Sequence, residues 1–352
     1  MFKKVILIII IILLAAVGAV VFYFFNQISQ PASDSADEVI FSVKKGEGVK
    51  VIASNLEKQG LVKNPFLFNA YVYLDGSEAK FIAGDYLLKK NYNIKELVKV
   101  FISGKVTNER VIKIIEGWTK NEIAEYLEKE SVVAEEDFLE AADVVDSRKI
   151  IPDKNYNYLA DKPAKADLEG FLFPDTYRVF KDSTSAQIIE KMLDNFGVKF
   201  TEQMRTDVAN GKMTVFQIVA LASVIEAEVK IDLDESGQPV NNDHYIVAGI
   251  FYNRLNSGMP LESDATINYI TSGDNPQPTS DELSIDSPYN TYKYTGLPPG
   301  PIGNPSLEAI KAAIYPEETD YLYFLHKIND DGSIVFSQTY QEHLENKAKY
   351  LN

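Results

Sequence analysis

The sequence predicts an α+β fold behind a single N-terminal transmembrane helix. Residues 5–25 form an unbroken run of apolar or small side chains without charge. Beyond this run, short apolar strands and amphipathic helices follow one another without the regular alternation of a doubly wound sheet. The chain has 352 residues, of which 45% are hydrophobic and 24% charged, a globular composition with room for two or three domains.

The apolar run is long enough to cross a bilayer, because a helix of this length spans about 31 Å. Lys3 and Lys4 precede it and the next basic residue is Lys44, which predicts an N-terminus inside the cytoplasm and an extracytoplasmic remainder. The alternative is a cleaved signal peptide, whose apolar region is shorter, about 7–15 residues. Length favours a retained anchor in the cytoplasmic membrane, with residues 1–4 as cytoplasmic tip, 5–25 as helix and 26–38 as linker.

Charge and composition exclude several classes of function. Acidic residues outnumber basic ones by 51 to 35, giving a net charge of −16, and such a field repels the phosphates of nucleic acids. The chain has no cysteine, which rules out disulfides, thiolate metal sites and cysteine nucleophiles. His244, His326 and His343 are far apart and form no pair with ligand spacing. No metal and no cofactor is therefore predicted.

Two segments that begin at Val43 and Ile114 share a pattern of strand, glycine turn and helix, with Gly46 and Gly117 at the turns. Further strands are expected at residues 81–88 and 111–115, and a helix at 94–102. Such small units resemble the LysM-type carbohydrate-binding module, and a purely structural spacer is the alternative. Trp118, the only tryptophan, is predicted to pack against the protein rather than stack on a sugar.

Residues 214–230 predict a helix that is apolar on nearly every side and therefore central to its domain. Thr214 and Gln217 have the spacing of a capping box. Glu226 and Glu228 lie two positions apart, about 200° around a helix, so they cannot share one face. Apolar surroundings raise the pKa of a carboxyl group, as a general acid requires. A carboxylate that reaches water from the end of the helix is the alternative.

The chain beyond this helix has four segments that are polar, aromatic and rich in turns, at residues 251–255, 258–266, 287–292 and 296–305. Prolines and glycines make the last of these a rigid loop. Amide and carboxylate groups suit sugar hydroxyls, and aromatic rings suit the faces of pyranose rings. These segments therefore favour sugar recognition, with a structural loop as the alternative.

Several long segments in order carry a resemblance that covers nearly the whole chain. They are residues 169–177 (EGFLFPDTY), 221–228 (LASVIEAE), 252–255 (YNRL), 258–261 (GMPL), 263–264 (SD), 289–292 (YNTY), 296–302 (GLPPGPI) and 321–324 (YLYF). In these segments the chain resembles the endolytic murein transglycosylases, the YceG-like single-pass membrane proteins of bacterial cell-wall synthesis. The resemblance implies a LysM-like region at residues 39–168 and a catalytic domain at residues 169–352.

The resemblance also implies the activity. Its members cleave the β-1,4 bond between N-acetylmuramic acid and N-acetylglucosamine within nascent peptidoglycan, leave a 1,6-anhydro end and thereby end the elongation of a strand. The family's catalytic glutamate falls on Glu226. The resemblance makes peptidoglycan strands and peptidoglycan synthases the expected partners. The candidates for support or substrate binding are Glu228, Asn253, Arg254, Asp264, Thr266, Asn290, Tyr292 and Asn304.

Some positions depart from the family pattern. Ala265 replaces a common proline, and the C-terminal stretch around residues 334–344 lacks a usual histidine and asparagine, which argues against a direct ligand role for the C-terminal strand. Two other functions stay open on sequence grounds. One is a non-catalytic scaffold that binds peptidoglycan, and the other is a muramidase that hydrolyses the same bond.

Overall fold

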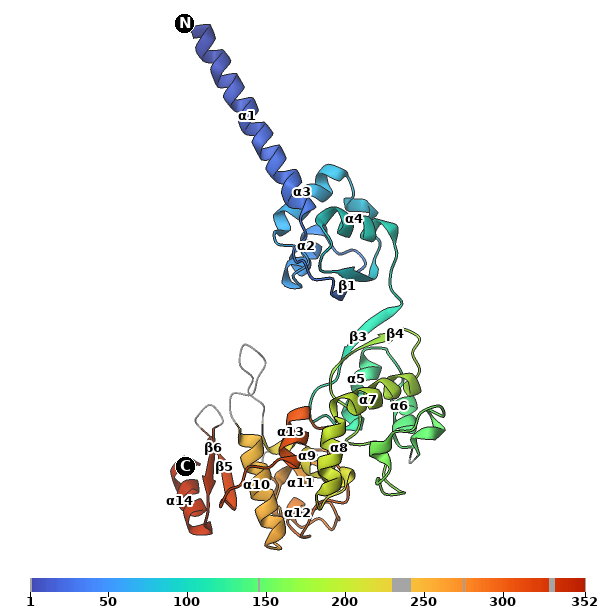
Figure 1. Ribbon diagram of the computed structural model, residues 1–352, viewed down its shortest axis with the longest axis vertical. Helices are drawn as coiled ribbons and strands as arrows, with labels where there is room; N and C mark the ends of the chain where they lie inside the picture. The colour runs from blue at the N-terminus through green and yellow to red at the C-terminus, as the bar shows by residue number, and fades with distance from the viewer. Residues whose placement is uncertain are drawn as a thin grey trace. The chain divides into compact units, whose positions relative to one another are not determined.

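The computed structural model describes residues 2–144, 146–229, 242–273, 275, 277–328 and 333–351, with side chains in the first helix described from Ile10 onward. It separates into two compact units. The first unit comprises Met1–Val111 and Arg178–Asp182, and the second comprises Ile112–Tyr177 and Ser183–Asn352 (Figure 1). Both mix helices with short strands. The predicted α+β class is therefore confirmed.

The first unit begins with the long helix α1 (Phe2–Ser29). Its segment Ile10–Ser29 is by itself long and apolar enough to cross a membrane. Side chains from Ile10 to Tyr23 are exposed. Near the end of the helix Ile28 is fully buried and Phe24 packs against the core of the unit. An apolar helix thus projects from a folded domain, as a single-pass anchor would, and its orientation stays a prediction.

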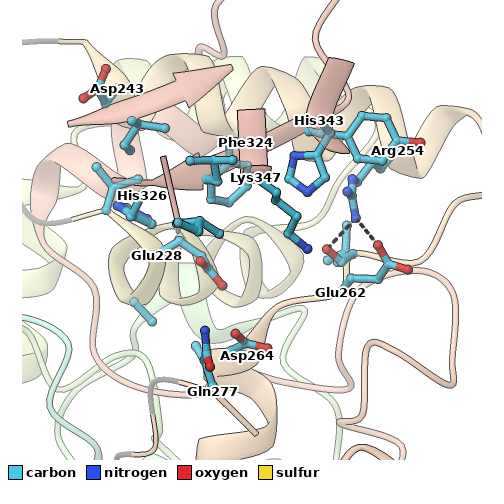
Figure 2. A pocket seen from close by; sticks show the side chains of 18 of the residues that line it. Glu228, Asp243, Arg254, Glu262, Asp264, Gln277, Phe324, His326, His343 and Lys347 are labelled. Atoms are coloured by element: carbon cyan, nitrogen blue, oxygen red, sulfur yellow. Dashed lines mark hydrogen bonds and ion pairs between the residues drawn. The ribbon is translucent and has the colours of Figure 1, made fainter. Parts of the chain in front are cut away.

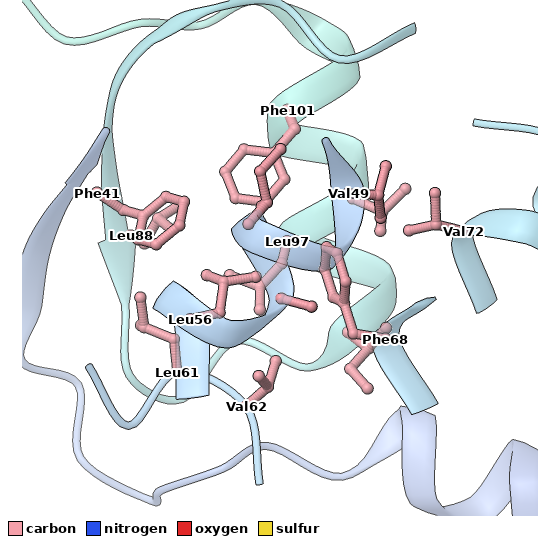
Figure 3. Packing of buried hydrophobic residues seen from close by; sticks show 14 of the residues in the cluster. Phe41, Val49, Leu56, Leu61, Val62, Phe68, Val72, Leu88, Leu97 and Phe101 are labelled. Carbon is pink, nitrogen blue, oxygen red and sulfur yellow. The ribbon is translucent and has the colours of Figure 1, made fainter. Parts of the chain in front are cut away.

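The remainder of the first unit packs around one small sheet. Strand β1 (Glu38–Val43) pairs antiparallel with β2 (Gly84–Lys89), so that Phe41 lies opposite Tyr86. Helices α2 (Val49–Lys58), α3 (Pro65–Asp75) and α4 (Ile94–Ser103) complete the core, which Figure 3 shows. β2 and α4 occupy the positions where sequence predicted a strand and a helix. The sequence did not predict α3.

The two similar segments do share strand, turn and helix. Gly46 and Gly117 adopt φ angles of 79° and 80°, a left-handed conformation that favours glycine over residues with a Cβ atom. The first glycine connects β1 to α2, and the second connects β3 (Glu109–Lys113) to α5 (Lys120–Lys129). The LysM-type identity and the boundary at residue 168 stay predictions, and by compactness the chain divides after Val111.

The second unit surrounds a buried central helix, α9 (Val215–Glu228), which packs against α8, α10, α11 and α13. β3 pairs with β4 (Thr176–Phe180), and β5 (Tyr323–His326) pairs antiparallel with β6 (Ile334–Ser337). The other helices are α6 (Glu135–Ala142), α7 (Ser185–Lys199), α8 (Glu202–Asn210), α10 (Asp243–Asn256), α11 (Asp264–Thr271), α12 (Ser280–Leu283), α13 (Leu307–Ile314) and α14 (Tyr340–Tyr350). Short 3-10 turns lie at Glu78–Lys80, Ser147–Lys149 and Asn157–Leu159.

Helix α9 has the character that the sequence predicted. Thr214 accepts a hydrogen bond from the backbone N–H of Gln217, and the Gln217 side chain accepts one from the N–H of Thr214, which completes the capping box. Side chains from Ile218 to Ile225 are all buried. The helix ends at Glu228, and the predicted end at residue 230 lies outside the described residues. The last turn of α9, at the edge of the apolar core, therefore contains the two carboxyl groups of Glu226 and Glu228.

Candidate functional site

The last turn of α9 places Glu226 and Glu228 in different surroundings, as their helical spacing predicted. Glu226 is half-buried, and its Oε2 atom accepts a hydrogen bond of 2.9 Å from the backbone N–H of Ser306. Ser306 is the N-cap of α13. Gly117 lies close by, because a Cβ atom built there would be 3.5 Å from Cγ of Glu226. Segments far apart in sequence thus meet at this carboxyl group.

Three influences act on the pKa of Glu226, two that raise it and one that lowers it. Burial raises the pKa of its carboxyl group, the hydrogen bond from Ser306 lowers the pKa, and the nearby charge of Glu116 raises it, with a net upward result. The protonated form is therefore easier to hold than in an exposed glutamate. The backbone N–H of Ser306 remains available to stabilise the ionised form. A group that first donates and then accepts a proton needs both properties.

Asn304 fixes the loops beside Glu226. Its Oδ1 atom accepts from the N–H of Leu172, and its Nδ2 donates to the carbonyl of Trp118 and to Glu169, each over 2.9 Å. The backbones of Asn304 and the residues Gly117 and Trp118 exchange two further hydrogen bonds of 2.8 Å. Asn304 is fully buried. Asn304 was predicted to support the site or to bind substrate. In the structure it holds the neighbouring backbone segments in place and presents no exposed surface to a ligand.

Glu169 belongs to the same hydrogen-bond network as Asn304. The sequence analysis did not predict it as a site residue. Its carboxyl group accepts from the backbone N–H of Lys120, at the start of α5, and from Asn304. Only 3% of the residue is exposed. Burial raises the pKa of Glu169 to about 8, with Asp167 adding to the effect and the hydrogen bond from Lys120 opposing it. The available signal was an acid directly before the apolar run at residues 170–174.

The loop at residues 296–305, predicted to be rigid and to bind sugar, is tied directly to α9. The backbone N–H of Ile302 donates to Oγ of Ser223 on that helix over 2.9 Å. Gly303 lies so close to Gly117 that a Cβ atom would come within 2.3 Å of the Gly117 carbonyl oxygen. The small residues of this loop thus permit the close backbone approach that brings residues 117 and 306 beside Glu226.

Glu228 opens into a different space, a pocket of about 1230 Å³ (Figure 2). Oγ of Ser263 donates to its carboxyl group over 2.5 Å. Burial raises the pKa of Glu228 to about 7, while the Ser263 hydrogen bond lowers it, Asp264 raises it and Arg254 lowers it. The walls come from the ends of α9 and α10, from α11, from β5 and β6, and from α14. They include Glu228, Arg254, Glu262, Asp264, Tyr292, Tyr323, His326, His343 and Lys347.

Four of the predicted supporting residues line this pocket, namely Glu228, Arg254, Asp264 and Tyr292. The hydroxyl group of Tyr292 donates to Asp264 over 2.5 Å, so this tyrosine positions an acid that faces the cavity. Arg254 also lines the pocket, and its guanidinium donates to the carbonyl of Leu322 over 2.7 Å and to the carboxylate of Glu262 over 3.0 Å. The arginine therefore binds two wall segments to each other while one face lines the pocket.

The remaining predicted residues do not line the pocket. Thr266 and Asn290 are fully buried, and Thr266 donates to the carbonyl of Ser263 over 2.7 Å. The amide of Asn290 donates to the carbonyls of Leu283 and Ile285, over 3.0 and 2.9 Å. Asn253 likewise donates to two backbone carbonyls of residues 319 and 321. These side chains shape the backbone around the site.

Two features near the site bear on other predictions. The ring of Trp118 lies 5.3 Å from that of Tyr126, so the tryptophan packs against the protein, and the absence of a sugar-stacking role stays a prediction. At the C-terminus, His343 stacks on Tyr323 at 5.3 Å between ring centroids, and both line the pocket with Lys347. The C-terminal segment, for which the sequence argued against a direct ligand role, therefore forms a wall of the pocket that Glu228 faces.

Comparison with known proteins gives one consistent family. The YceG-like family matches residues 41–349. An endolytic murein transglycosylase of Bacillus subtilis (strain 168) is 33% identical over 323 residues, which cover 91% of this chain and 86% of that protein. One of Streptococcus pneumoniae serotype 2 is 31% identical over 342 residues, which cover 91% of this chain and 60% of that protein.

A solved structure supports the same relationship. The crystal structure of a YceG-like protein from Listeria monocytogenes matches with a TM-score of 0.58 and 32% sequence identity. The match covers 89% of this chain and the whole of that chain. Sequence and fold thus point to the same group of proteins, over both units of this chain.

Proposed function

The chain belongs to the YceG-like family, and from this premise we propose that it is an endolytic murein transglycosylase with Glu226 as its acid and base. The substrate is the β-1,4 bond between N-acetylmuramic acid and N-acetylglucosamine within a nascent glycan strand. Cleavage there ends the elongation of that strand. The observation that carries the assignment to Glu226 is its half-buried carboxyl group, with a raised pKa and a backbone N–H at 2.9 Å.

The reaction balances with one carboxyl group. Protonated Glu226 donates its proton to the glycosidic oxygen as the bond from this oxygen to C1 of muramic acid breaks. The C6 hydroxyl oxygen of the same sugar then bonds to C1, and its proton passes to the Glu226 carboxylate. The enzyme returns to its starting state and no water is consumed. Because the nucleophile is already tethered to the substrate, proximity replaces the second carboxylate of ordinary glycosidases.

Helix α1 determines the proposed cellular location of the enzyme. We assign it as a single-pass anchor in the cytoplasmic membrane, with the N-terminus inside. The segment Ile10–Ser29 is long and apolar enough to span a bilayer, and Lys3 and Lys4 precede the apolar run whereas the next basic residue is Lys44. The catalytic unit then lies outside the cytoplasm, where nascent peptidoglycan is made. Peptidoglycan synthases are the expected neighbours.

Mass spectrometry of the products tests the proposal. The full chain in detergent is incubated with isolated peptidoglycan strands, and the new ends are weighed. Anhydro ends, which lack one water relative to reducing ends, support the transglycosylase. Reducing ends would instead establish a muramidase. Intact strands with the wild-type protein would leave only the function of a peptidoglycan-binding scaffold.

Glu228 is the second candidate for the proton donor. It faces a pocket of about 1230 Å³ and its pKa is raised to about 7, which suits a general acid near neutral pH. A Glu226→Gln variant with wild-type activity, together with an inactive Glu228→Gln variant, would transfer the role to Glu228. We assign Glu226 because its carboxyl group has a backbone N–H at 2.9 Å to stabilise the ionised form, and the resemblance places the family's catalytic glutamate at the same position.

A further inference from the structure

Helix α3 of the first unit is apolar on two opposite sides. Phe68 and Val72 are fully buried in the core. On the other side Phe66, Tyr73 and Leu74 are 74%, 79% and 70% exposed. These three residues, here called the α3 stripe, have the spacing i, i+7 and i+8, which places them along one face of a helix. No charged residue interrupts the helix between residues 65 and 74.

The α3 stripe belongs to the same unit as the apolar helix α1. α3 packs directly against α1, and Figure 1 shows it at the end of the first unit from which α1 projects. The last turns of α1 expose three further aromatic residues, Phe22, Tyr23 and Phe25, between 53% and 74%. Nζ of Lys95 on α4 lies 5.8 Å from the centroid of the Phe25 ring. Exposed aromatic residues and one lysine thus lie at the last turns of α1.

We propose that the α3 stripe is a second membrane contact, which lies in the interfacial layer of the bilayer that α1 crosses. This inference rests on the proposed role of α1 as an anchor. Tyrosine and phenylalanine beside a spanning helix favour the level of the lipid headgroups, and a lysine there places its charge in the same layer. The contact holds the first unit against the membrane, so that it does not swing freely on the end of α1.

The absence of cysteine from the chain permits a direct test without a background mutation. Single variants Leu74→Cys, Val51→Cys and Tyr23→Cys of the full chain receive a nitroxide spin label and enter vesicles of phosphatidylglycerol and phosphatidylcholine. Val51 is the matched control, because it is an aliphatic residue on α2 of the same unit and 51% exposed. Power saturation of the spectra with oxygen and with a water-soluble nickel chelate reports the depth of each label.

The label at position 74 is expected to favour oxygen over nickel, close to the label at position 23, while that at position 51 favours nickel. Introducing both Phe66→Asp and Tyr73→Asp should shift label 74 toward nickel, and the buried side of α3 stays unchanged in that variant. If label 74 matches label 51 while label 23 lies in lipid, the α3 contact is wrong and the anchor stands. If label 23 also lies in water, the anchor itself is wrong. A third outcome would also overturn the proposal: label 74 is inaccessible to both nickel and oxygen, and this inaccessibility increases with protein concentration. That result would identify a second copy of the chain as the partner of the α3 stripe.

Discussion

The two glutamates at the end of α9 share one helix and one residue type, yet they meet different environments. Glu226 lies between loops of distant sequence and receives its hydrogen bond from the backbone of Ser306. Glu228 opens into a pocket and receives its hydrogen bond from the side chain of Ser263. Burial is the main cause of the raised pKa in both. A raised pKa therefore does not by itself distinguish catalysis from support, and the surrounding contacts must do so.

The largest expected effect separates the two carboxyl groups. Glu226→Gln should lower kcat by about 10²–10⁴-fold, the usual result of removing a general acid and base. Glu228→Gln should lower it by at most about tenfold, because a single hydrogen bond contributes about 0.5–1.5 kcal/mol. Release of anhydro ends from isolated strands measures both. Equal losses in the two variants would contradict the division of roles.

The next test uses two buried asparagines, one near Glu226 and one in the segments around the Glu228 pocket. Asn304 and Asn290 are both fully buried, and each side chain donates two hydrogen bonds and accepts one. Replacing either by alanine leaves buried backbone groups unpaired and should lower the free energy of unfolding by about 2–4 kcal/mol. Urea unfolding of the full chain in detergent, followed by Trp118 fluorescence, measures this loss.

The same pair also tests position against stability. Asn304 holds the backbone of residues 117 and 118 beside Glu226, whereas Asn290 holds the segment before Tyr292. At a temperature where both variants are folded, Asn304→Ala should therefore lose more turnover than Asn290→Ala. An equal loss of turnover would show that the network under Glu226 serves folding alone.

The sequence predicted that Glu226 and Glu228 lie on different faces of α9, but it did not predict which segments pack against each face. Helical periodicity and the capping box at Thr214 depend on neighbouring residues, so α9 and the divergence of its glutamates could be predicted. The approach of Gly117 and Ser306 to Glu226 joins residues about a hundred positions apart, and no local pattern contains it. For the same reason Glu169 was missed.

Polar residues in turn-rich segments were the least predictable. Asn253, Thr266 and Asn290 have side chains that suit sugar hydroxyls, but the structure uses them to bind backbone carbonyls. Both uses require the same donors and acceptors, so the sequence cannot separate them. Asp264 and Tyr292 came from the same segments and do line the pocket. The difference is burial, which only the packed structure supplies.

A third test concerns the pH dependence of stability on the Glu226 side. The pKa of Glu169 rises from 4.5 to about 8 on folding, so folding favours its protonated form. Its favourable contribution is fully present below about pH 4.5 and is lost as pH rises through about 8. Glu169→Gln cannot ionise, so its free energy of unfolding relative to wild type should increase by about 1–3 kcal/mol between about pH 5 and pH 9.

Urea unfolding at both pH values measures the Glu169 effect. Glu228→Gln serves as the comparison on the pocket side, where the pKa rises only to about 7. The increase in its free energy of unfolding relative to wild type should therefore be complete at a lower pH than the corresponding increase for Glu169→Gln. A difference between wild type and Glu169→Gln that stays constant with pH would show that Glu169 keeps an ordinary pKa in the folded protein.

The smallest expected effect concerns the hydroxyl group of Ser263. This group donates to Glu228 and lowers its pKa against the larger effect of burial. Ser263→Ala removes the donor, so the pKa of Glu228 should rise above about 7. Carbon-13 NMR of the glutamate carboxyl groups as a function of pH would follow the titration, with Glu228→Gln identifying the signal. Glu226 is the internal control, because its hydrogen bond comes from the backbone of Ser306, and its titration should not move. A parallel shift of both groups would show that the two sides of α9 are electrostatically one site.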